Sequence, residues 1–177
     1  MKKLNKGFIQ IYTGNGKGKT TAAIGQAVRA SGAGLKTYFV QFMKDYPYSE
    51  IKSLAILNEH IILEQVGNDD FVLKKTPPNN TELKLATEGL NKAKEKMLSG
   101  EFDIIILDEV CVSIYFGLFK TIDILKFLKL KPENVELILT GRYCPLELID
   151  AADLVTEMVE VKHYYKNGIE ARKGIES

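Results

Sequence analysis

The chain has 177 residues, of which 45% are hydrophobic and 27% charged, a composition that fits a single folded domain over residues 1–177. Its 24 lysines and arginines nearly balance 23 aspartates and glutamates, so no whole-protein field would attract nucleic acid or an anionic membrane. No segment approaches the roughly 18 apolar residues of a membrane span, and the first apolar stretch is too short for a signal peptide, so we expect a cytoplasmic protein.

The first 42 residues predict a βαβ unit. Residues 8–12 are apolar and β-prone and run into a glycine-rich loop. Residues 19–34 then carry apolar side chains at helical spacing, and residues 37–42 form a second apolar run. Two strands joined through a helix lie parallel in one sheet.

Helices and strands alternate along the rest of the chain. The predicted strands are 61–66, 103–109, 135–140 and 154–161, and the predicted helices are 49–57, 81–100, 120–130 and 145–152. Ser49 and Thr81 are candidate N-caps. Residues 67–80 predict a long loop, and residues 162–177 a polar and aromatic tail without periodicity. The pattern predicts an α/β fold, a mostly parallel sheet flanked by helices on both faces, of the P-loop NTPase-like (RecA-like) type.

The stretch "TGNGKGKT" (Thr13–Thr20) nearly matches the phosphate-binding pattern G-x-x-x-x-G-K-[ST], with Thr13 in place of the first glycine. Glycines let backbone N–H groups turn toward an anion at the start of a helix, Lys19 can reach a phosphate oxygen, and the Thr20 hydroxyl can bind magnesium. A glycine-rich turn without a ligand is the alternative; the order of strand, loop, Lys-Thr and helix favours a bound nucleotide. The predicted ATP-binding residues are Gly14, Asn15, Gly16, Lys17, Gly18, Lys19, Thr20 and Thr21.

Two carboxylates, Asp108 and Glu109, end the apolar run of residues 103–109. The carboxyl ends of parallel strands meet at one edge of a sheet, where ligands of open α/β sheets bind. We therefore predict that Thr20, Asp108 and Glu109 hold Mg²⁺, and that Lys19, Thr20 and Glu109 are catalytic. An ordinary acidic pair at a strand end is the alternative.

Aromatic residues offer a second kind of site. Phe42, Phe71 and Tyr115 either floor a pocket for a large planar ligand or belong to the core. Arg142 follows a predicted strand, at the edge expected for Lys19, and either contacts a phosphate or ligand carboxylate or lies on the surface.

Several stretches together resemble one known family, the P-loop type of ATP:cob(I)alamin adenosyltransferase, or corrinoid adenosyltransferase. They are "TGNGKGKTTAA", "VQFMK", "IIILDEV", "LILTGRYCPLELIDAADLVTEM" and "VKHYYKNGIEARKGIE". The resemblance spans about residues 7–176. Its most distinctive parts are the loop that begins with Thr13 and the closing pattern H-x-x-x-x-G-I-x-A-x-x-G-I, His163–Ile175.

The resemblance implies transfer of the 5′-deoxyadenosyl group of ATP to the Co(I) of a reduced corrinoid, with release of triphosphate. It also implies a corrinoid substrate (cobalamin or a precursor), an electron-donating reductase such as a flavoprotein, and a homodimer as a candidate assembly. It assigns Phe42, Phe71, Tyr115 and Arg142 to the corrinoid. Relatives carry a "G-F-x-W"-like stretch where this chain has "DFVL", so Phe71 matches the phenylalanine and Leu73 replaces the tryptophan.

Two other functions fit the same loop. A P-loop ATPase or small-molecule kinase would use Glu109 to orient water or an acceptor and would produce ADP. A binding module would hold ATP without turnover. The products formed from ATP and a reduced corrinoid distinguish the three.

Overall fold

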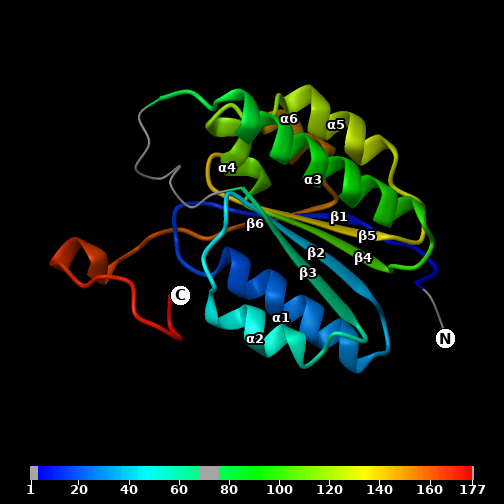
Figure 1. Cartoon of the computed structure of the whole chain (residues 1–177), viewed down its shortest axis with the longest axis horizontal. Helices are drawn as coiled ribbons and strands as arrows, with labels where there is room; N and C mark the ends of the chain where they lie inside the picture. The colour runs from blue at the N-terminus through cyan, green and yellow to red at the C-terminus, as the bar shows by residue number, and fades with distance from the viewer. Residues whose placement is uncertain (1–3, 68–75, 177) are drawn as a thin grey trace.

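The structure, a computed structural model, describes residues 4–67 and 76–176. Its centre is a six-stranded sheet in the order β3-β2-β4-β5-β1-β6, in which each pairing is parallel (Figure 1). The strands are β1 (Ile9–Thr13), β2 (Thr37–Phe42), β3 (Ile61–Val66), β4 (Ile104–Asp108), β5 (Glu136–Thr140) and β6 (Leu154–Glu157). The predicted parallel α/β fold is confirmed.

Helices cover both faces of the sheet. They are α1 (Lys19–Gly32), α2 (Ser49–Ala55), α3 (Asn80–Leu98), α4 (Val110–Tyr115), α5 (Thr121–Lys129) and α6 (Leu146–Ala151), and a 3₁₀ helix, η2 (Tyr164–Asn167), follows. Figure 1 shows α1 and α2 on one face and the other four α-helices on the opposite face. Because both faces are covered, every residue of β2 and β4 is buried, which explains their apolar sequences.

The structure differs from the predicted elements at α4, at the end of β6, in the tail, where η2 was not predicted, and at the N-caps of α2 and α3. The N-cap residue of α2 is Tyr48 and not Ser49. Helix α4 was not predicted, and it follows β4 after the single residue Glu109. Strand β6 ends at Glu157, four residues before the predicted end, because the chain then leaves the sheet at Met158 and passes the phosphate loop. The predicted loop 67–80 includes Phe71 and Leu73, which lie outside the described residues.

The order of the strands determines how the site is assembled. Strand β5 lies between β1, which leads into the phosphate loop, and β4, which ends at Asp108. The last residue of β5, Thr140, is therefore placed between the two motifs, although it is distant from both in sequence. All three strands deliver their carboxyl ends to one edge, where open parallel sheets bind ligands.

Helix α3 begins one residue earlier than predicted and has a different N-cap. The side chain of Asn79, not Thr81, accepts a hydrogen bond from the Glu82 N–H at 3.0 Å, and the Glu82 carboxylate accepts one from the Asn79 N–H at 2.7 Å. This reciprocal capping box satisfies two N–H groups that the helix leaves without partners. Asparagine followed by glutamate three residues later was visible in the sequence as "NNTE".

Asn79→Ala is expected to lower the free energy of unfolding by about 1 kcal/mol, because it removes the N-cap acceptor of α3. Asn80→Ala, the adjacent exposed position in the first turn, is the matched control and should change the stability much less. Urea denaturation of both variants measures the difference. Equal losses would mean that the capping box does not stabilise α3.

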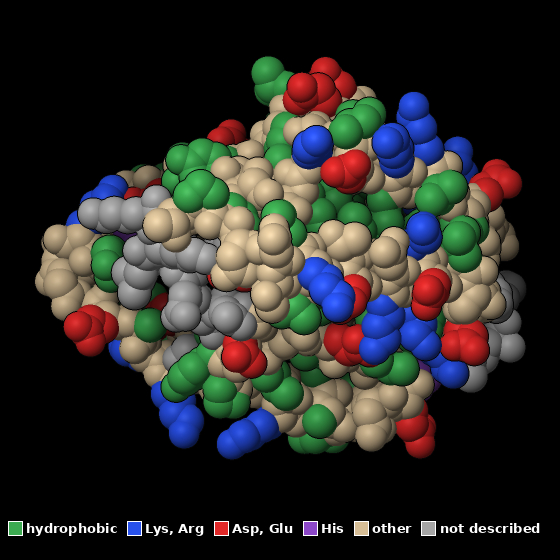
Figure 2. Space-filling view, turned by 45° about the horizontal axis from the view of Figure 1, so that its top comes forward, with side chains coloured by type: hydrophobic (Ala, Val, Ile, Leu, Met, Phe, Trp, Pro, Cys, Tyr) green, Lys and Arg blue, Asp and Glu red, His purple; other side chains and the backbone are tan. Residues whose placement is uncertain are grey.

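Charge on the surface agrees with the balanced composition. Figure 2 shows lysine and arginine side chains interspersed with aspartate and glutamate on the face in view, in a chain of net charge +1. In the two described ranges, no helix combines the length and apolar character that crossing a membrane requires.

Candidate active site

The phosphate loop connects β1 to α1, and its backbone requires glycine. Gly14 and Gly18 have φ angles of 95° and 121°, a region that side-chain-bearing residues rarely adopt. A Cβ atom on Gly16 would lie 2.7 Å from the carbonyl oxygen of Met158, which accepts the Gly16 N–H at 2.6 Å. The glycines thus let the loop turn tightly against the chain that leaves β6.

Thr13 stands where the phosphate-loop pattern has its first glycine. Thr13 ends β1 with an extended backbone, so this position does not need the conformational freedom of glycine. Its hydroxyl donates a hydrogen bond to the Gly141 carbonyl oxygen at 2.9 Å. The departure from the pattern therefore ties the start of the loop to the segment after β5.

Lys19 opens α1 and is buried, with 7% of its surface exposed. Its ammonium donates to the carbonyl oxygen of Gly16 at 2.8 Å, so the side chain curls over the loop. Burial lowers the pKa of Lys19, while the negative charge of Glu109 acts in the opposite direction. The first turn of α1 contains no acidic residue, so the positive end of the helix is left for an anion.

Asp108 lies fully buried at the end of β4 and accepts hydrogen bonds from four side chains of the site. Its Oδ1 accepts hydrogen bonds from the hydroxyls of Thr20 at 2.9 Å and Thr140 at 2.6 Å. Its Oδ2 accepts from Gln41 Nε2 at 3.2 Å and Lys44 Nζ at 3.1 Å. Thr20 and Asp108, which the sequence assigned to one metal site, are therefore in direct contact.

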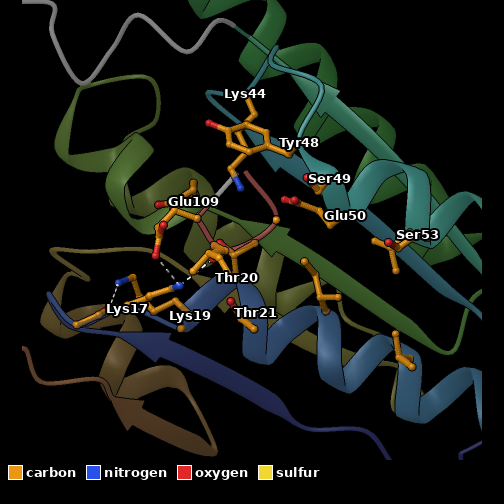
Figure 3. Close-up of a pocket in the computed structure, with 18 of the residues that line it drawn as sticks. Lys17, Lys19, Thr20, Thr21, Lys44, Tyr48, Ser49, Glu50, Ser53 and Glu109 are labelled. Carbon is orange, nitrogen blue, oxygen red and sulfur yellow. Dashed lines mark hydrogen bonds and ion pairs between the residues drawn. The ribbon is translucent and has the colours of Figure 1, made fainter. Parts of the chain in front are cut away.

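Glu109 follows Asp108 with a left-handed backbone, φ 60°, and is the N-cap residue of α4. Its N–H donates to Thr140 Oγ1 at 2.9 Å, and its side chain lines the pocket beside Lys19 and Thr20 (Figure 3). Burial raises the pKa of Glu109, and the negative charge of Asp108 raises it further. A non-glycine residue in this conformation is uncommon and turns the carboxylate away from the strand.

Lys44 is a site residue that the sequence analysis did not select. It lies just beyond β2, after Met43, whose φ of 58° is left-handed. Its ammonium is 3.1 Å from Asp108 Oδ2 and 5.0 Å from the centre of the Tyr48 ring. A cation directly after a buried central strand was the available signal, since the same edge carries Lys19 and Asp108.

The C-terminal segment lies against the phosphate loop. Lys17 Nζ donates to the Ile175 carbonyl oxygen at 2.7 Å and to the Glu176 carboxylate at 3.1 Å. Glu176 also accepts hydrogen bonds from Arg172 and from the Tyr164 hydroxyl. Figure 1 shows this segment, in orange and red, beyond the carboxyl edge of the sheet. Periodicity could not predict these contacts, because they join the phosphate loop to a tail whose regular structure, in the described residues, is the short 3₁₀ helix η2.

One pocket of about 670 Å³ joins these groups (Figure 3). Its lining includes the phosphate loop and the start of α1, Glu109 and Arg142, and Gly174, Ile175 and Glu176 of the C-terminal segment. Apolar side chains continue the lining between α1 and α2: Ile24, Val28, Leu54 and Leu57. The pocket thus offers cations and the N-terminal end of α1 in one part and apolar side chains in another.

Comparison with known proteins identifies the family. The sequence profile of ATP:corrinoid adenosyltransferase BtuR/CobO/CobP matches residues 5–177. The corrinoid adenosyltransferases of Escherichia coli strain K12 and Salmonella typhimurium strain LT2 are 33% and 32% identical over 172 residues, which cover 97% of this chain and 86% of each relative. The chain belongs to the ATP:corrinoid adenosyltransferase family.

A solved structure supports the fold. The flagellar accessory protein FlaH from Methanocaldococcus jannaschii is similar with a TM-score of 0.62, over 87% of this chain and 72% of that one. The two sequences are 16% identical, so this likeness concerns the fold alone.

The four residues that the sequence analysis assigned to the corrinoid of this adenosyltransferase do not share one environment. Phe42 has no exposed surface and packs edge-on against Phe119, with ring centroids 5.2 Å apart, so it takes the core position that was the alternative. Tyr115 is 61% exposed and its ring lies 4.3 Å from that of Tyr143. Arg142 lines the pocket, and Phe71 is outside the described residues.

Glu176→Gln is expected to loosen the C-terminal segment of this adenosyltransferase. Hydrogen bonds from Arg172 and Tyr164 hold the pKa of Glu176 well below its usual range, so the residue is a carboxylate at neutral pH. Neutralising it removes the charge that Lys17 and Arg172 share. Trypsin should therefore cleave after Arg172 and Lys173 several-fold faster than in the wild type. Glu170→Gln, an exposed glutamate of the same segment, is the control. Equal cleavage rates in all three proteins would contradict the expectation.

Proposed function

We propose that this protein transfers the 5′-deoxyadenosyl group of ATP to the Co(I) of a reduced corrinoid and releases triphosphate, with the whole chain acting as one catalytic domain. The observation that carries the proposal is the convergence of Lys19, Thr20 and Glu109 on one pocket, with the buried Asp108 hydrogen-bonded to Thr20, in a chain that matches the family over residues 5–177.

In the proposed reaction the corrinoid Co(I), as substrate, donates an electron pair to C5′ of the ribose. A cobalt–carbon bond forms while the C5′–O bond breaks, and the electron pair of that bond leaves with the triphosphate. No proton has to move, so the site needs no general base. The protein has to hold C5′ in line with the nucleophile and to stabilise the negative charge that grows on the leaving group.

The phosphate loop is suited to the second task. Lys19 and the N–H groups at the start of α1 face the position of the phosphates, and both interact more strongly as negative charge accumulates. Lys19 is buried, where water screens a charge least. The apolar side chains between α1 and α2 give the other end of the pocket a nonpolar surface.

Mg²⁺ is the metal that we propose for the site. Hard oxygen donors suit it, and the residues fit, because Thr20 Oγ1 and Asp108 Oδ1 lie 2.9 Å apart and the Glu109 carboxylate lines the same pocket. Thr20, Asp108 and Glu109 would hold the ion, directly or through water. When bound, Mg²⁺ supplies positive charge to the phosphate oxygens.

The reaction also implies partners. Co(I) has to be generated by a reductase, for which a flavoprotein is our candidate, and we propose that both proteins act in the cytoplasm. A homodimer is our candidate assembly.

The deciding experiment is incubation of the protein with ATP, Mg²⁺ and chemically reduced cobalamin. We expect adenosylcobalamin and triphosphate in equal amounts, measured by absorbance and by ³¹P NMR. ADP and phosphate would instead identify an ATPase or kinase, and unchanged ATP would identify a binding module.

A further inference from the structure

The side chain of Lys44 lines the pocket and is held in place by its neighbours. Only 12% of its side chain is exposed, and the left-handed turn at Met43 directs it back over the end of β4. Its ammonium points into the pocket toward Thr20 and Glu109, as Figure 3 shows. Lys44 thus approaches from β2, whereas Lys19 approaches from α1.

The ion pair with Asp108 does not by itself account for this lysine. Asp108 also accepts hydrogen bonds from Thr20, Thr140 and Gln41, so three donors would remain on the carboxylate without Lys44. A carboxylate has about four acceptor positions, and three neutral donors already satisfy most of them. Hydrogen bonding at Asp108 therefore does not require a fourth donor that carries a positive charge.

The Lys44 ammonium has three N–H bonds, and in the described part of the chain one acceptor, Asp108 Oδ2, lies within hydrogen-bond distance. A nearly buried cation that makes one hydrogen bond within the described residues, beside a phosphate loop, is suited to an anionic ligand.

We propose that Lys44 is a second catalytic cation of the site, which contacts the triphosphate of ATP from the side opposite Lys19. This inference rests on the proposed function, because the triphosphate of ATP is the leaving group of that reaction. As the C5′–O bond breaks, its electron pair moves onto the triphosphate oxygen, and the Lys44 ammonium stabilises that charge without giving up a proton. The contact strengthens during the reaction, so it should affect kcat more than ATP affinity.

Inorganic tripolyphosphate tests the contact without any reaction, with Mg²⁺ present and no corrinoid. Calorimetry on Lys44→Gln should show binding about tenfold or more weaker than in the wild type, the loss expected for one charge-assisted hydrogen bond. Lys44→Arg retains the charge and should recover part of the affinity. Lys52→Gln, an exposed lysine of α2 outside the pocket lining, is the matched control and should bind as the wild type does.

Turnover and stability complete the test. With ATP and Co(I), Lys44→Gln should lower kcat by a larger factor than it weakens ATP binding. It also leaves the buried Asp108 carboxylate without its ion pair, so its thermal midpoint should fall below that of Lys52→Gln, and binding and turnover are measured well below that midpoint. Unchanged tripolyphosphate affinity together with a lower midpoint would overturn the proposal, because Lys44 would then serve only to neutralise Asp108. Tighter Mg²⁺ binding with unchanged tripolyphosphate affinity would also overturn it. If the wild type forms no adenosylcobalamin while Lys44→Gln still loses tripolyphosphate affinity, the proposed function fails and the phosphate contact stands.

Discussion

Lys19→Ala should strongly weaken ATP binding while leaving the protein folded. The ammonium is the buried cation of the phosphate loop, and the substitution removes its charge without opening a cavity in either apolar core, since the side chain lies over Gly16. Losing one charge-assisted contact costs about 1.5–3 kcal/mol, which weakens ATP binding by roughly 10- to 150-fold. Adenosyl transfer should fall further, because the contact strengthens as the triphosphate leaves.

Calorimetric titration with ATP and a single-turnover assay with Co(I) measure the two effects. Lys17→Ala is the informative control, because Lys17 lies in the same loop but is partly exposed and paired with the C-terminal segment. It should lose much less affinity than Lys19→Ala. Wild-type turnover by a folded Lys19→Ala protein would show that this loop does not hold the nucleotide.

The regular part of the fold could be predicted because its signals are local. Apolar runs bounded by glycine or charge defined the strands, and the Lys-Thr start of α1 identified the phosphate loop. Asp108 could be placed at the ligand edge because a run buried on both faces has to be a central parallel strand.

The rest of the site depends on contacts between distant segments. Thr140 bridges Asp108 and Glu109 only because β5 is inserted between β1 and β4, and no pattern in residues 135–140 announces that order. Helix α4 has six residues and follows β4 directly, so it offers too short a stretch for helical periodicity. The tail at Glu176 is positioned by Lys17, 159 residues earlier. Such contacts are visible from sequence only through resemblance to a family.

The two adjacent carboxylates should respond to neutralisation in opposite ways. Asp108→Asn replaces an acceptor with an amide whose NH₂ group meets the donors of Gln41 and Lys44 or those of Thr20 and Thr140. It also leaves the nearly buried Lys44 without its counter-ion, so we expect a loss of about 3 kcal/mol in the free energy of unfolding. Glu109→Gln should leave the stability unchanged or increase it, because burial beside Asp108 disfavours the Glu109 carboxylate.

The pH dependence of stability separates the two cases. The folded protein raises the pKa of Glu109 above its ordinary value of 4.5, so protons bind more tightly to the folded state. The stabilising contribution of Glu109 is therefore fully present below the unfolded pKa and is lost as pH rises through the folded one. In Glu109→Gln this decline above about pH 4.5 should be absent from urea denaturation curves. A decline identical to that of the wild type would assign the titration to another group.

Glu109→Gln should lower the rate of adenosyl transfer although it does not lower the free energy of unfolding. Glu109→Gln retains the shape of the side chain but removes an anionic oxygen, so Mg²⁺ should bind more weakly and adenosyl transfer should fall by more than ATP affinity does. The measurements are Mg²⁺ titration in the presence of ATP, single-turnover transfer to Co(I), and unfolding of both variants. If Asp108→Asn alone impairs transfer at saturating Mg²⁺, while Glu109→Gln reacts normally, Asp108 rather than Glu109 is the carboxylate on which the reaction depends. If Glu109→Gln instead increases the free energy of unfolding and slows the reaction, Glu109 is a residue retained for catalysis at the expense of stability.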